Sequence, residues 1–124
     1  YPMRNRSILK SFQKAGEGFI FILKTHKHFK FQILIGIFAI IAGMILRISY
    51  FEWLILILIV WGGLIVESFN TALEEICNLI QKQHSYTVKI AKDISGAGVL
   101  LFVICSLIIS IIIFAPKILL LFNN

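Results

Sequence analysis

Three long apolar runs constrain the fold of this chain more than any other feature of its sequence. Residues 33–46, 53–66 and 94–115 contain no charged side chain. With their flanks, these runs reach the roughly 18 to 20 residues that a helix needs to cross a bilayer. A segment inside a bilayer must satisfy its backbone polar groups internally, and a single helix does so. The runs therefore predict an all-α integral membrane protein with three transmembrane helices.

The composition agrees with a membrane protein and excludes an ordinary soluble domain. Of the 124 residues, 59% are hydrophobic and only 15% are charged, whereas soluble domains contain about 25% charged residues. A chain of this length forms at most one domain. We therefore expect a single membrane-embedded domain that covers residues 1–124.

The boundaries of the spans follow from the prolines and charges around the apolar runs. No proline lies between Pro2 and Pro116, so nothing breaks the second helix, which would be about 45 Å long and would emerge into water. Pro116 is expected to end the third span, and residues 81–93 are expected to form a polar loop. The predicted spans cover residues 29–48, 53–82 and 94–115.

The basic residues predict how the chain lies in the membrane. Residues 1–30 carry seven Lys or Arg and a single acid, Glu17, and residues 82–92 carry three lysines. Basic segments beside spans stay on the cytoplasmic side and contact anionic headgroups, so we expect no nucleic acid partner. Apolar residues recur at steps of three and four in residues 8–23, which predicts an amphipathic helix on the membrane surface.

A polar stripe is expected on the second span, running from inside the cytoplasmic leaflet into the water. On a helical wheel, at about 100° per residue, five polar residues of this span all lie within roughly 60° of Glu67, the first of them. Amide side chains often hold membrane helices together, but a carboxylate near lipid is costly and marks a functional site. Either close packing of the spans or an oligomer must cover this stripe. The polar stripe consists of Glu67, Asn70, Thr71, Glu74 and Asn78.

The residue types near the polar stripe favour phosphoryl transfer. The Glu74 carboxylate suits Mg²⁺, which takes one or two carboxylates plus phosphate oxygens. Lys92 and Asp93 are expected at the same membrane level, where a lysine can neutralise a phosphate, and Glu67 can accept a proton from a lipid hydroxyl. An alternative is a small oligomeric transporter or ion pathway that loads protons or cations on the two glutamates, although transport sites lie near the midplane.

Two motifs in this chain carry a resemblance to a known family. The pattern E-x-x-N-[ST]-A-[IL]-E-x-x-x-[DN] occupies residues 67–78, and A-K-D followed by small residues occupies residues 91–98. With the three spans, these motifs resemble the prokaryotic diacylglycerol kinase family, which includes undecaprenol kinases. The resemblance runs from residue 11 to the end of the third span.

The resemblance implies a homotrimer of three-span subunits with a surface helix, in the bacterial inner membrane, with active sites shared between subunits on the cytoplasmic side. It implies transfer of the ATP γ-phosphoryl group to undecaprenol or diacylglycerol with Mg²⁺. In this family's pattern Glu67 is similar to the catalytic base and Asn70 to a site asparagine. Glu74 resembles a ligand of the metal and nucleotide, and Lys92 and Asp93 resemble the pair that engages the nucleotide.

Three positions depart from the family pattern. His26 stands where a glutamate usually joins the metal site, Asn78 where an aspartate is common, and Gln32 where a histidine is frequent. Histidine can bind metal, so His26 is a candidate metal ligand beside Glu74, but imidazole suits Mg²⁺ poorly. Either Glu74 and phosphates alone hold the metal, or activity is weakened, and a catalytically impaired family member is a third interpretation. Glu17 is a candidate nucleotide contact, with relief of charge crowding among the lysines as the alternative.

Overall fold

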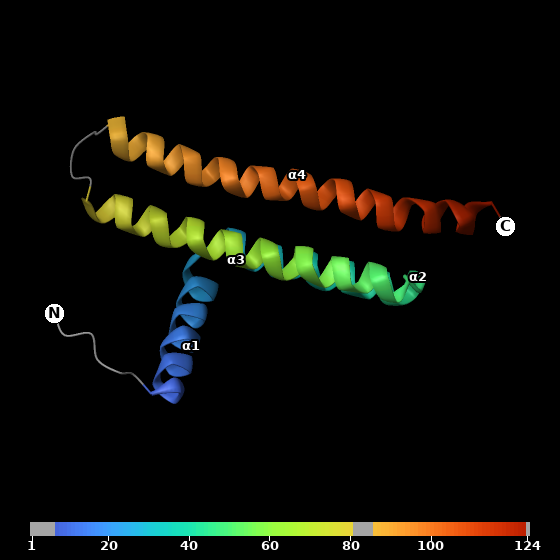
Figure 1. The fold of residues 1–124 in the computed structure, drawn as a ribbon, viewed down its shortest axis with the longest axis horizontal. Helices are drawn as coiled ribbons and strands as arrows, with labels where there is room; N and C mark the ends of the chain where they lie inside the picture. Colours follow the sequence, from blue (N-terminus) through green and yellow to red (C-terminus); the bar gives the residue numbers. More distant parts are fainter. Residues whose placement is uncertain (1–6, 81–85, 124) are drawn as a thin grey trace.

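The protein folds into α-helices throughout the part that the computed structural model describes, residues 7–80 and 86–123. Figure 1 shows three long helices that run along one another and a shorter one that leaves their side. The all-α prediction is confirmed. The four helices of the described residues are α1 (Ile8–Thr25), α2 (Lys27–Leu46), α3 (Tyr50–Ile80) and α4 (Tyr86–Phe122).

Three of these helices, α2, α3 and α4, are long and apolar enough to cross a membrane. They alternate in direction, so α2 starts toward the end of the bundle where α3 ends and α4 starts, and α1 departs beside α3 short of that end (Figure 1). We call this end of the bundle the polar end. The outer faces are apolar: Trp61 is 60% exposed and Leu101 is 68% exposed. Such faces need lipid or other protein to cover them.

The first two helices begin and end where local chemistry dictates. The Ser7 side chain caps α1 by accepting a hydrogen bond from the Lys10 backbone N–H at 3.2 Å, as helix-capping serines do. His26 is extended and separates α1 from α2. Arg47, in the left-handed region with φ 53°, ends α2. The helix predicted at 8–23 is therefore confirmed and extends to Thr25.

The helix that contains the predicted third span, residues 94–115, is longer than that span at both ends. Residues 86–93, which were predicted to belong to a loop, are helical, and Lys89 and Asp93 form an exposed i,i+4 ion pair at 2.7 Å there. The helix also continues through Pro116 to Phe122, since a membrane helix tolerates the one backbone hydrogen bond that proline removes. The predicted end of the second span at Lys82 lies outside the described residues.

Glycines bring the three long helices close together. A Cβ on Gly36 of α2 would lie 2.9 Å from a methyl of Val60 on α3. A Cβ on Gly62 of α3 would lie 2.6 Å from the Phe102 ring of α4. Small residues at membrane helix contacts allow the backbones to approach and gain packing energy. These two contacts fix which sides of α2 and α4 face α3.

An ion pair ties the end of the bundle opposite the polar end. Glu52 accepts a hydrogen bond from the Ser49 backbone N–H at 2.9 Å, and its own N–H donates to the Ser49 hydroxyl, which is a capping box. Lys117, just after Pro116, lies 3.0 Å from the Glu52 carboxylate. The pair therefore links the first turn of α3 to the last part of α4.

We expect Lys117→Met to lower the unfolding temperature of the detergent-solubilised protein, because the substitution leaves the partly covered Glu52 without its cationic partner. Circular dichroism against temperature measures the change. Lys14→Met is the matched control, since Lys14 forms only an exposed ion pair of 3.7 Å within α1, and such pairs contribute little. Equal unfolding temperatures for Lys117→Met and wild type would contradict a stabilising role for the pair.

Candidate active site

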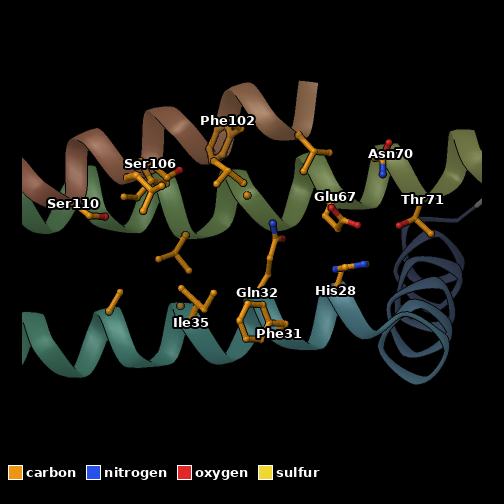
Figure 2. A pocket seen from close by; sticks show the side chains of 18 of the residues that line it. His28, Phe31, Gln32, Ile35, Glu67, Asn70, Thr71, Phe102, Ser106 and Ser110 are labelled. Carbon is orange, nitrogen blue, oxygen red and sulfur yellow. The ribbon is translucent and has the colours of Figure 1, made fainter. Parts of the chain in front are cut away.

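Helices α2, α3 and α4 enclose a cleft of about 590 Å³ that opens on one side of the bundle. Figure 2 shows its two parts: Glu67, Asn70, Thr71 and His28 gather toward the polar end, and mainly apolar side chains line the rest. On α3 the lining runs from Leu56 to Glu74, about 27 Å at the rise of a helix. The cleft thus joins a polar site to a long apolar trough.

The polar stripe of α3 forms most of the polar part. Glu67, Asn70, Thr71 and Glu74 all line the cleft, so the face predicted from their spacing does point inward. The first three are buried, with Glu67 only 8% exposed, whereas Glu74 lies at the open margin. Packing of the three helices in one chain is therefore enough to cover the inner half of the stripe.

A hydrogen-bonded relay crosses from α4 to α3 at the polar end. The Ser95 hydroxyl donates to Asn70 Oδ1 at 2.7 Å, and Asn70 Nδ2 donates to Glu74 Oε1 at 2.9 Å. One turn further out, Lys92 Nζ donates to Asn78 Oδ1 at 3.1 Å. These contacts bring Lys92 to the same end of the bundle as Glu74.

Two further candidate residues lie outside the cleft lining. Asp93 is exposed and bound to Lys89 of its own helix at 2.7 Å. Glu17 is exposed on α1 and pairs with Lys14 at 3.7 Å. Neither belongs to the described residues that line the cleft. Their nucleotide-binding roles stay predictions.

His26 lies at the polar end but beside a different acid from the one predicted. Its Nε2 is 3.6 Å from Glu75 Oε1, and its Nδ1 is 2.7 Å from the Thr25 hydroxyl. His26 and Glu74 both line the cleft, and their joint role in metal binding stays a prediction. Within residues 7–80 and 86–123, no three His, Cys, Asp or Glu side chains are grouped to hold a metal ion.

The available donors nevertheless fit a magnesium ion that is held largely by phosphate. Mg²⁺ commonly takes one or two protein carboxylates and completes its shell with phosphate oxygens and water. Glu74 at the cleft margin and Glu67 deeper inside are the carboxylates that the cleft offers. A preformed protein cage is not needed for such a site.

Sequence reasoning missed two residues that α2 contributes to the cleft. In Figure 2, His28 points from α2 toward Glu67, and Gln32 projects between Glu67 and the apolar part. Gln32 Oε1 is buried and has no hydrogen-bond partner among the described residues. The steps from 28 to 32 and from 32 to 36 place His28, Gln32 and Gly36 on one helical face, which is a signal available from the sequence.

Comparison with known proteins shows the family of this chain. The model of the family described as prokaryotic diacylglycerol kinase matches residues 13–114. The undecaprenol kinase of Bacillus subtilis is 35% identical over 108 residues, covering 87% of this chain and 88% of that protein. The diacylglycerol kinase of Synechocystis is 29% identical over 114 residues, covering 91% of this chain and 65% of that protein. This chain therefore belongs to the prokaryotic diacylglycerol kinase family, a family of lipid kinases.

Proposed function

We propose that this protein transfers the γ-phosphoryl group of ATP to the hydroxyl of a membrane lipid, undecaprenol or diacylglycerol. The observation that carries the proposal is the continuity of the buried Glu67 site with the apolar trough between α2 and α4. A lipid alcohol has the matching shape, with one polar end and a long hydrocarbon chain. The names of the similar proteins, undecaprenol kinase and diacylglycerol kinase, support this substrate class.

The substrate hydroxyl would lie where the polar and apolar parts of the cleft meet. Glu67, which lines the cleft there, would take the proton of the hydroxyl as general base. Gln32 offers a buried acceptor without a partner at the same boundary, and a buried polar atom normally requires one. The lipid hydroxyl would first bind by donating a hydrogen bond to Gln32 Oε1. It would then turn its single proton to Glu67 as the phosphoryl group is transferred.

The nucleotide and magnesium would occupy the open margin of the polar end. Glu74 would hold the ion with the help of phosphate oxygens, and His26 is the further candidate ligand nearby. When bound, Mg²⁺ neutralises the charge of the transferring phosphoryl group. Lys92, already directed to this end by Asn78, would approach the phosphates, and Asp93 and Glu17 are the remaining candidates for nucleotide contacts.

The same proposal includes the arrangement of the protein in the membrane. We place the polar end and α1 at the cytoplasmic face of the bacterial inner membrane, with the apolar side of α1 in contact with lipid. On that side Ile8, Leu9 and Phe12 are each more than 70% exposed. A homotrimer would cover apolar outer faces of α2–α4 and complete the open margin of each cleft with residues of a neighbouring subunit.

Transfer of radiolabel from γ-labelled ATP to lipid tests the proposed function. The purified protein in detergent micelles receives undecaprenol or diacylglycerol at equal mole fraction, with and without Mg²⁺. We expect labelled lipid phosphate only with Mg²⁺ present. No labelled product from either lipid with folded protein would overturn the proposal. Proton or cation flux in protein-containing liposomes, without lipid phosphorylation, would support the transporter alternative.

The Gln32 side chain gives a prediction specific to the lipid substrate. Gln32→Met keeps the length of the side chain but removes its amide, so we expect the KM for the lipid alcohol to rise roughly three- to tenfold, the usual cost of one hydrogen bond. The KM for ATP should not change. Gln13→Met on exposed α1 is the matched control. An unchanged lipid KM in the Gln32 variant would show that this amide does not bind the hydroxyl.

A further inference from the structure

Ser95 is one of the small residues that follow A-K-D in the second motif, and it contacts a candidate site residue although it does not line the cleft. Its hydroxyl donates to Asn70 Oδ1 at 2.7 Å across the α3–α4 interface, where both residues are at least partly buried. The amide then donates to Glu74 Oε1 at 2.9 Å. Ser95 therefore reaches the Glu74 carboxylate through a single intermediate, Asn70.

The two hydrogen bonds select one orientation of the Asn70 amide. An asparagine presents a donor group on one side and an acceptor on the other. If the amide were reversed, Oδ1 would face the carboxylate of Glu74, and two acceptors would repel each other. The orientation in the structure places Nδ2 on Glu74 and leaves Oδ1 in need of a donor, which Ser95 supplies. Hydrogen bonds in such a chain also polarise and strengthen one another.

We infer that Ser95 is a positioning residue that acts through Asn70 to hold the Glu74 carboxylate in one orientation toward a divalent cation. Glu74 lies at the open margin of the cleft, where an untethered carboxylate would sample several rotamers. Fixing it in advance reduces the entropy lost when the cation and triphosphate bind. The inference rests on the proposed function in that it takes Glu74 to be the cation ligand.

Binding of Mn²⁺, measured by electron paramagnetic resonance with a non-hydrolysable ATP analogue, tests the inference without catalysis. Mn²⁺ accepts the same oxygen ligands as Mg²⁺. We expect Ser95→Ala to weaken Mn²⁺ binding roughly three- to tenfold, the cost of one hydrogen bond. Ser95→Thr, which retains a hydroxyl, should stay within about twofold of wild type. In activity assays the KM for Mg-ATP should rise in Ser95→Ala, and the KM for lipid should not.

A matched control and a mutant cycle separate positioning from a general loss of structure. Ser68→Ala removes an exposed α3 hydroxyl that donates to the Leu64 carbonyl of its own helix and should leave Mn²⁺ binding unchanged. Within a relay, effects are not additive, so Ser95→Ala should add little in an Asn70→Ala background. Independent, additive effects would overturn the inference.

The outcomes for Ser95 and for the proposed function are distinguishable. Wild-type binding of Mn²⁺ by Ser95→Ala overturns the inference, even when the wild-type protein phosphorylates lipid. An absence of Mn²⁺ binding in the wild-type protein also overturns it, because Glu74 then has no cation to meet. Failure of lipid phosphorylation alone counts against the proposed function, while the binding measurement still decides the role of Ser95. If Ser95→Ala does not fold, Ser95→Cys provides a similar volume with a weaker donor, and the same loss of binding is expected.

Discussion

Glu67→Gln is expected to reduce the turnover number for lipid phosphorylation by roughly 10²- to 10⁴-fold, the range that a positioned general base contributes. The substitution keeps the shape of this buried side chain, which is 8% exposed, but removes the carboxylate that would accept the hydroxyl proton. The KM for Mg-ATP should change little, because we place the nucleotide at the open margin, beyond Glu67. Steady-state kinetics with varied ATP and varied lipid measure both quantities.

The control for Glu67→Gln is a glutamate on the same helix that lies outside the cleft lining. Glu75 does not line the cleft, because it is exposed and faces His26. Glu75→Gln should keep most of the wild-type turnover. Turnover within twofold of wild type in Glu67→Gln would show that another group accepts the proton. Loss of activity together with loss of helical circular dichroism would instead indicate that Glu67 is needed for folding.

Glu74→Gln should lower kcat/KM for Mg-ATP on the order of 10²- to 10³-fold, because a ligand of the charge-neutralising metal would be lost. Its amide oxygen still accepts the hydrogen bond from Asn70 Nδ2, so the relay survives while the negative charge disappears. Mn²⁺ binding in the presence of the ATP analogue should weaken in parallel, and a higher Mg²⁺ concentration should restore part of the rate.

The adjacent carboxylates Glu74 and Glu75 provide a direct comparison of two possible metal sites. If Glu75 and His26, which lie 3.6 Å apart, held the metal, Glu75→Gln would be the variant that loses Mn²⁺ binding. Our assignment to Glu74 predicts the opposite order. Should this chain be a catalytically impaired family member, Glu74→Gln would leave lipid phosphorylation unchanged at its background level.

The sequence was sufficient for the features that depend on one segment at a time. The absence of charge over residues 33–46, 53–66 and 94–115 indicated the three apolar helices that the structure contains. The spacing of Glu67, Asn70 and Glu74 indicated that they share one face of a helix, since that spacing depends only on the helical repeat. The two motifs indicated the family that the comparisons then showed.

The sequence was misleading where a local rule competed with the environment. Polar residues in 86–93 suggested a loop, but a helix can leave the membrane and continue into water, where Lys89 and Asp93 support it. Pro116 suggested a helix end, because proline breaks isolated helices. Here the helix continues, and Lys117 just beyond it binds Glu52 of α3.

Only the tertiary structure decided which side chains meet the polar stripe. Helix α2 is largely apolar, so its sequence offers only the spacing of His28, Gln32 and Gly36 as a sign of the face that turns toward α3. Close contacts such as Gly36 against Val60 set the rotation of α2 about its own axis. This rotation brings His28 and Gln32 into the cleft. The Ser95 relay likewise depends on how α4 packs against α3. The helical repeat determines which residues share a face of each helix, so the sequence was sufficient for that step. Side-chain packing between the helices determines which faces meet, so only the tertiary structure shows which residues form the site.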